Sequence, residues 1–214
     1  MDLLTAVRDR RSIRAFTPEL VSEQTVIEVL ELAQWAPSWG NTQPWAVFVV
    51  TGERLEKLKA AYRERWAANA GRFFEIAPPR PDWPAKLAER MRLIMVGRAL
   101  SNEVGSPAPS NADFYGAPCL LLFAIDEQLQ PEYACFDTGL LVQTVCLVAH
   151  AKGLGTCIMA MAVGYPDVLH DLVPAAAGRQ FVVGVALGVP DVKSPINRLD
   201  RQRASLTELA SFVS

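Results

Sequence analysis

A run of basic residues near the N-terminus is the first feature that could do chemistry. The short predicted opening helix runs into Arg10, Arg11, Ser12 and Arg14. Guanidinium groups bind phosphate through charge-assisted and often bidentate hydrogen bonds, and a hydroxyl group adds another donor. The run is therefore a candidate phosphate cradle. The alternative is a solvated basic turn in which Asp9 pairs with a neighbouring arginine, and the run taken alone favours that alternative.

A second candidate is the loop at residues 37–45, with the sequence PSWGNTQPW. It lies between a predicted helix and a predicted strand, and it places Asn41 and Gln43 between Trp39 and Trp45. Loops on rigid scaffolds commonly carry recognition groups, so this one could hold a flat ring with polar edges. The alternative, which the residues support equally, is a turn whose Asn41 and Gln43 bond their own backbone.

Two further segments are weaker signals by themselves. The glycines of residues 153–157, GLGTC, could end the preceding helix or permit close approach of a ligand, and the first role is the commoner. They lack the GxGxxG spacing and follow a helix, so they are not a dinucleotide fingerprint. Arg201 and Arg203, with Arg198 upstream, form a second basic group that is more often a solvated face.

Taken in order, these four segments resemble the nitroreductase family of FMN enzymes. The resemblance covers nearly the whole chain, from RRSIR through PSWGNTQPW and GLGTC to RQR, and the loop is its most specific part. It implies an α+β fold with a mixed sheet flanked by helices. It also implies an intertwined homodimer with FMN at the interface, where both subunits contribute to each site.

The same resemblance implies particular flavin contacts. The basic residues would hold the phosphate and ribityl groups, with Arg14 near the pyrimidine edge, and the loop would come from the other subunit. A backbone N–H at Ala160 or Met161 would point towards flavin N5. Many bacterial members carry a glutamate and a glycine there, whereas residues 159–162 are apolar. The implied set is Arg10, Arg11, Ser12, Arg14, Pro37, Ser38, Trp39, Asn41, Ala160, Met161, Arg201 and Arg203.

The activity implied by the family is a ping-pong transfer of electrons from NAD(P)H through FMN to a nitroaromatic, a quinone or a similar flat acceptor. Flavin N5 would carry the chemistry, so no catalytic side chain is expected. Other flavin reactions on this scaffold, such as flavin fragmentation, dehalogenation or dehydrogenation, stay open, as does a non-catalytic FMN-binding protein. Aromatic residues in the long loops are candidates for a substrate lid or, equally, for anchors to the core: Phe73, Phe74, Trp83, Phe114 and Tyr115.

Composition sets the wider limits. The chain has 214 residues, half of them hydrophobic, so a single domain over 1–214 is expected. A formal net charge of −2 favours neither nucleic acid nor a membrane surface as a partner. The N-terminus has no apolar signal core, which predicts a cytoplasmic protein. Four scattered cysteines without clustered histidines predict reduced core residues and no metal site.

The elements that must position these residues follow from periodicity and turn signals. Buried strands are predicted at 46–51 and 119–125, and further strands at 154–159 and 181–187. A lid or insert is expected at about 71–115 and an extended tail at about 193–214. The run 140–151 is apolar nearly all round, so the core or a dimer partner must cover it. Helices are predicted at 3–7, 22–33, 53–70, 84–103, 131–152, 165–172 and 206–212.

Overall fold

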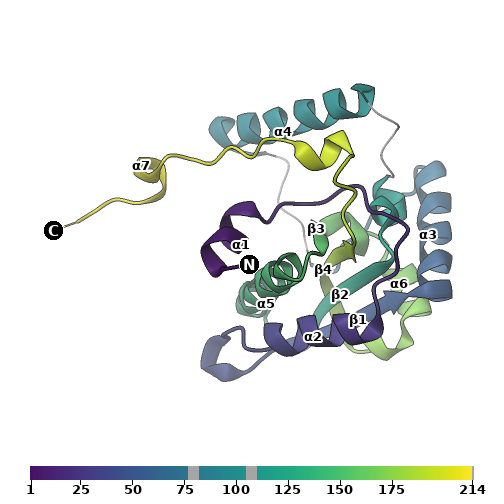
Figure 1. Ribbon diagram of the computed structural model, residues 1–214. Helices are drawn as coiled ribbons and strands as arrows, with labels where there is room; N and C mark the ends of the chain where they lie inside the picture. Colours follow the sequence, from purple (N-terminus) through teal and green to yellow (C-terminus); the bar gives the residue numbers. More distant parts are fainter. Residues whose placement is uncertain (77–81, 105–109, 214) are drawn as a thin grey trace.

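The computed structural model describes residues 1–76, 82–104 and 110–213. Its centre is a four-stranded sheet in the order β1-β2-β4-β3, with helices against both faces (Figure 1). The α+β fold is confirmed, and so are the predicted strands, whose ends shift by at most two residues. The strands are β1 (Trp45–Thr51), β2 (Cys119–Asp126), β3 (Gly155–Met159) and β4 (Arg179–Gly188).

The pairing within the sheet is antiparallel for each neighbouring pair of strands. In the described residues the parallel pairing is limited to one isolated bridge, between Ser12 and Thr156. The mixed character that the family resemblance implies is confined to this bridge, because the N-terminal segment adds a single residue pair beside β3 instead of a full strand.

Strand β2 separates two hydrophobic clusters. Leu120 and Leu122 belong to the cluster formed with α3 (Gly52–Ala67) and α6 (Pro166–Leu172). Leu121 and Phe123 belong to the cluster formed with α2 (Glu23–Ala33) and α5 (Pro131–Ala151). Successive side chains of a strand point to opposite faces, so a strand covered on both faces is apolar without alternation. The prediction of a buried strand is confirmed for β2.

Strand β1 is less buried than its sequence predicts. It lies at the edge of the sheet, and Val49 is 45% exposed while Val50 is buried. Continuous apolar sequence does not distinguish an edge strand from a central one, because the order of strands depends on long-range pairing. The prediction of a buried strand at 46–51 is therefore wrong for much of its length.

The helices are close to the predicted ranges. Ser22 caps α2 as predicted, with its hydroxyl accepting a 3.1 Å hydrogen bond from the Thr25 N–H. The helices are α1 (Leu3–Asp9), α2 (Glu23–Ala33), α3 (Gly52–Ala67), α4 (Ala85–Val104), α5 (Pro131–Ala151), α6 (Pro166–Leu172) and α7 (Leu206–Leu209).

Helix α5 has one buried face and one open face. Leu141, Val145 and Ala149 pack against the sheet, but Tyr133 is 71% exposed and Phe136 is 63% exposed. By length and composition α5 could cross a membrane, yet 44% of its most apolar window is buried inside the molecule. A core helix passes the same test, and this helix packs as one.

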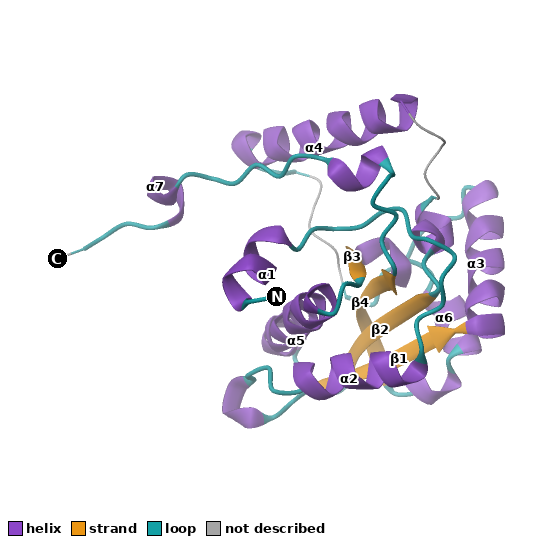
Figure 2. Cartoon of the chain, viewed as in Figure 1, coloured by secondary structure: helices purple, strands orange, loops and turns teal. Residues whose placement is uncertain are grey.

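Helix α4 and the C-terminal tail form an outer layer (Figure 1). Ion pairs join Lys86 and Arg90 of α4 to Glu208 of α7. Beyond α7 the chain extends away from the body (Figure 2). Within the predicted lid or insert at about 71–115, residues 71–76 are irregular, and residues 77–81 and 105–109 lie outside the described part.

Candidate functional site

Two of the predicted segments meet at the start of β3. The Ile13 N–H donates a 2.8 Å hydrogen bond to the Thr156 carbonyl, beside the bridge from Ser12 to Thr156. A Cβ atom on Gly155 would lie 2.8 Å from the Ile13 side chain. The second glycine of GLGTC therefore allows the basic run to pack closely, and the two segments form one unit.

The C-terminal tail joins the same unit. The Arg201 guanidinium donates to the carbonyls of Arg8 and Arg10 at the end of α1. A cavity of about 250 Å³ lies between the tail and the basic run. We call the basic residues that line it, together with Ser12, the arginine cluster: Arg10, Arg11, Ser12, Arg14, Arg201 and Arg203.

Asn197 fixes the tail against the basic run. This side chain is 6% exposed, and its Oδ1 accepts a 2.7 Å hydrogen bond from the Arg14 N–H. Its Nδ2 donates to the carbonyls of Ala15 and Asp191, at 2.7 and 2.9 Å. A buried amide with its hydrogen bonds made is well suited to hold two distant segments in one arrangement.

The electrostatics of the arginine cluster fit an anion. Burial lowers the pKa of Arg201, and the charges of Arg11, Arg203 and Arg10 lower it further. The Nε atom of Arg14 is buried and has no hydrogen-bond partner among the described residues. Crowded like charges and an unpaired buried donor both cost free energy that an acceptor with negative charge would offset. The cluster therefore fits the phosphate and polar ring edge of a flavin nucleotide.

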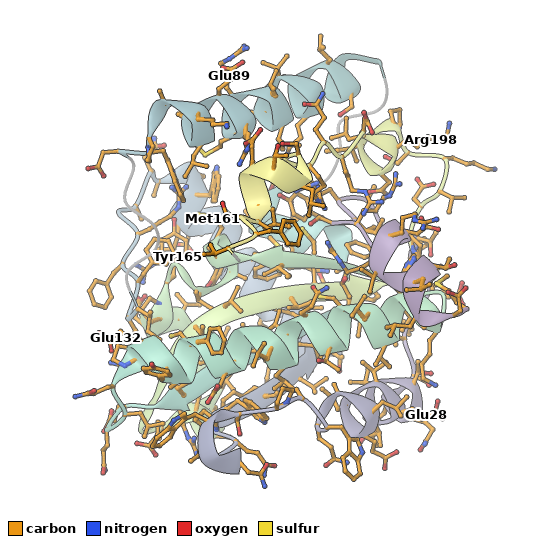
Figure 3. The ribbon with its side chains drawn as sticks, turned by 90° about the vertical axis from the view of Figure 1, so that its left-hand side faces the viewer. Glu28, Glu89, Glu132, Met161, Tyr165 and Arg198 are labelled. Atoms are coloured by element: carbon orange, nitrogen blue, oxygen red, sulfur yellow. The ribbon has the colours of Figure 1, made fainter. Side chains whose placement is uncertain are left out.

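The segment expected near flavin N5 lies at the other end of β3. From Thr156 to Met159 the strand advances about 10 Å, at about 3.3 Å per residue, and a short 3-10 helix at Ala160–Val163 follows it. Met161 and Arg198 are well separated in Figure 3. Ala160 is exposed and Met161 is half-buried. The Tyr62 hydroxyl holds the segment by donating a 2.8 Å hydrogen bond to the Ala162 carbonyl. The site is thus elongated, with charge at one end and an apolar segment at the other.

The tryptophan loop, which we define as residues 37–43, is held largely by its own hydrogen bonds. The Ser38 hydroxyl accepts from the Gln43 N–H at 2.9 Å, and the Thr42 hydroxyl donates to the Trp39 carbonyl at 2.9 Å. The Gln43 amide donates to the Asn41 carbonyl at 3.3 Å. This is the self-bonded turn that the sequence left open. It exposes Pro37, Trp39 and Asn41, and Trp39 is 72% exposed.

Within one chain the tryptophan loop lies far from the arginine cluster. The Trp39 N–H donates a 3.0 Å hydrogen bond to Asp137, near the start of α5. His150, near the end of α5, lines a second cavity with Arg10 and Arg11. Thirteen residues of helix at about 1.5 Å each separate Asp137 from His150 by about 20 Å. The structure brings three of the four predicted segments together, and it leaves the loop apart.

Comparison with known proteins shows the family. Residues 7–189 match the model of the Nitroreductase family. The chain belongs to the nitroreductase family. It is 31% identical over 220 residues to a 4-nitrobenzoate reductase of Pseudomonas putida, covering 99% of this chain and 96% of that relative.

Solved structures of family members are also similar over the full length. The FMN-dependent nitroreductase NfnB of Mycobacterium smegmatis, in complex with NADPH, has a TM-score of 0.88 at 27% identity, with 100% of both chains covered. The FMN- and NADPH-dependent nitroreductase NfnB of Sphigopyxis sp. strain HMH has a TM-score of 0.92 at 26% identity, again with 100% of both covered.

The predicted substrate aromatics of this family member divide into two groups. Phe73 is 68% exposed and Trp83 is 39% exposed. Phe74 packs against the core. Phe114 is fully buried, 5.1 Å from the Tyr62 ring, and Tyr115 is 5% exposed. The burial of Phe114 and Tyr115 favours the anchor role that the sequence left open beside the lid, and the backbone is left-handed there, with φ values of 47° and 58°.

Three residues of the site were missed by the sequence prediction. Asn197 stands in a polar tail and Arg98 in a charged helix, so neither pattern marks them. Arg98 donates a 3.0 Å hydrogen bond to the Tyr115 hydroxyl. Burial raises the pKa of Cys157, while the charges of Arg14 and Arg98 act in the opposite direction, so both guanidinium groups lie near this thiol. Asp137 had a usable signal, as the one acidic residue of α5 beyond its first turn.

Proposed function

We propose that this chain binds FMN and passes electrons from NADH or NADPH to a nitroaromatic or similar flat acceptor. The observation that carries the proposal is the buried, unpartnered Nε of Arg14 within a cluster of crowded guanidinium groups. Full-length similarity to nitroreductases that use FMN and NADPH supports it. Binding of FMN by the arginine cluster would supply the cofactor on which the redox activity depends.

Residues at the two ends of the site would have different roles. Bound FMN would take a hydride from the nicotinamide and return electrons to the acceptor. Arg10, Arg11, Arg201 and Arg203 would bind the phosphate. Arg14 would stabilise negative charge at the pyrimidine edge of the ring.

The acceptor end would be apolar. Ala160 and Met161 would border the reactive part of the ring with backbone groups, since their side chains offer no hydrogen bond. Phe73, the more exposed of the two exposed loop aromatics, would contact a flat acceptor. The similarity to a 4-nitrobenzoate reductase makes 4-nitrobenzoate a suitable first acceptor to test.

The test uses the purified chain in three steps. FMN is titrated into the protein, the complex is reduced anaerobically with NADH or NADPH, and 4-nitrobenzoate is added. We expect saturable FMN uptake, bleaching of the flavin absorbance by a nicotinamide, and its return with the nitro compound. A protein that takes up no FMN would refute the proposal. If neither a nitroaromatic nor a quinone reoxidised the reduced flavin, the proposed class of acceptor would be refuted.

We also infer that the functional form is a homodimer. The separation of the tryptophan loop from the arginine cluster supports this, since a second copy could supply the loop. The open face of α5, with Tyr133 and Phe136, and exposed Phe212 in the tail add apolar surface of the kind that interfaces bury.

A mixed dimer tests whether sites are shared between subunits. One chain carries Arg11→Ala and Arg14→Ala, and the other carries Trp39→Ala and Asn41→Ala. With shared sites, the mixed dimer regains one site of wild-type FMN affinity, because the intact loop and the intact cluster then meet. Two equally weakened sites, or a monomer in sedimentation analysis, would contradict the shared site.

We further infer a cytoplasmic location. Three of the four free cysteines, Cys119, Cys146 and Cys157, are buried thiols, which is compatible with a reducing compartment. Cell fractionation checks this, and recovery in an extracytoplasmic fraction would contradict it.

A further inference from the structure

We propose that Asp137 is a positioning residue, which holds the tryptophan loop in the place from which it contacts flavin in the partner subunit. This inference rests on the proposed function and extends it to a residue of the core. Asp137 touches neither ligand nor reacting atoms in the proposal, and it acts through the backbone of Trp39.

The Asp137 carboxylate is buried. Asp137 is 3% exposed, within the first two turns of a helix whose other buried residues, apart from Thr138, are apolar. Among the described residues, its one hydrogen bond is the 3.0 Å contact from the Trp39 N–H to Oδ2. A buried carboxylate costs stability unless it is bonded, so a residue of this kind is typical of a specific structural task.

The hydrogen bonds inside the tryptophan loop are local. The bonds from Gln43 to Ser38 and from Thr42 to Trp39 join residues of the loop to one another. They fix its shape, and they leave its position relative to the helices unset. The bond to Asp137 joins positions 98 residues apart. It therefore ties the preformed loop to a rigid element.

The bond to Asp137 also sets the side of the molecule on which the loop lies. Helix α5 carries Asp137 on its buried face and Phe136, the preceding residue, on its open face. In the proposed homodimer the second copy covers that open face. A loop fixed to α5 is then fixed relative to the partner's arginine cluster, and a displaced loop would weaken flavin binding in the partner's site while the chain's own cluster stays intact.

The experiment compares variants that keep or remove the acceptor. Asp137→Leu keeps the side-chain volume but removes the hydrogen-bond acceptor, and Asp137→Ala removes both the volume and the acceptor. Asp137→Asn keeps an oxygen that can accept from the Trp39 N–H. Thr138→Val is the matched control, because Thr138 is also buried but its hydroxyl bonds to Ala134 in the same helix. We expect the Kd for FMN to rise about tenfold in the Leu and Ala variants. We expect a change below threefold in the Asn and Val variants.

Amide hydrogen exchange gives a second readout that a general loss of stability would not reproduce. The Trp39 amide should lose protection in the Leu and Ala variants, while the amides of α2 and β2 keep theirs. Unchanged FMN affinity and unchanged Trp39 protection in a folded Asp137→Leu protein would overturn the inference. Wild-type protein that binds no FMN would refute the proposed function instead. Hydrogen exchange at the Trp39 amide would still test whether Asp137 holds the loop in place.

A mixed dimer locates the effect. One chain carries Asp137→Leu and the other carries Arg14→Ala. If Asp137 serves the partner's site, the site that combines the Asp137→Leu chain's cluster with the other chain's loop keeps wild-type affinity. Absence of any wild-type site in the mixed dimer would overturn the inference.

Discussion

The arginine cluster and the tryptophan loop contribute to the proposed flavin site in different ways. In the cluster, Arg201 bonds to the backbone of Arg10 across 191 residues of sequence, and the charges repel one another. In the loop, the hydrogen bonds of Ser38, Thr42 and Gln43 span at most five residues, and none involves a charged group. The cluster is thus a charged junction that an anion would stabilise, whereas the loop is a preformed backbone shape.

The two regions should therefore respond differently to substitution. Removing a side chain from the cluster should act on ligand binding or on the junction between distant segments. Removing one bond within the loop should have a smaller effect, because neighbouring bonds preserve its shape. Four measurements test this contrast between the arginine cluster and the tryptophan loop.

The largest effect is expected for Asn197→Ala, which removes the buried amide between the tail and the basic run. Three hydrogen bonds of 2.7–2.9 Å are lost, at about 1 kcal/mol each, so the free energy of unfolding should fall by about 3 kcal/mol. Urea denaturation measures it. A loss below about 0.5 kcal/mol would mean that the junction does not depend on this residue.

Arg14→Ala should come next and should act mainly on ligand affinity. Hydrogen bonds to charged groups contribute about 1.5–3 kcal/mol, so FMN affinity should fall roughly 10- to 100-fold. Fluorescence titration measures it. Arg63→Ala is the matched control, since Arg63 is exposed and pairs with Asp113 at the surface. An equal loss in both variants would point to a general charge effect.

Thr42→Val in the tryptophan loop should have a smaller consequence. It removes the 2.9 Å bond to the Trp39 carbonyl in an exposed loop, so stability should fall by less than about 1 kcal/mol. FMN affinity should change by only a few-fold. A loss as large as that of Arg14→Ala would show that the loop depends on single bonds in the same way as the cluster does.

The smallest effect is a pH dependence at the cluster's end of α5. Burial lowers the pKa of His150 below its ordinary value of 6.5, with the charges of Arg10, Arg201 and Arg11 adding to the effect and Asp9 opposing it. Below that value the unfolded chain binds a proton more readily than the folded one, so stability should decrease as pH falls from about 7 to 5. His150→Gln should make this slope shallower, as measured by thermal unfolding across that range. An unchanged slope of stability against pH in this variant would contradict the assignment of the pH dependence to His150. The loop itself contains no titratable side chain.

The sequence by itself determined the elements and the kinds of chemistry. Periodicity placed the strands and helices, and the clustered arginines and the PSWGNTQPW loop indicated phosphate and ring recognition, because these signals are local in the chain. The tertiary structure decided which segments meet. It brought Asn197 against the basic run and Arg98 against Tyr115, and it turned Phe114 and Tyr115 into the core. It also made β1 an edge strand and set the tryptophan loop about 20 Å from the arginine cluster along α5. Such contacts follow from long-range packing, and no local pattern of residues encodes them.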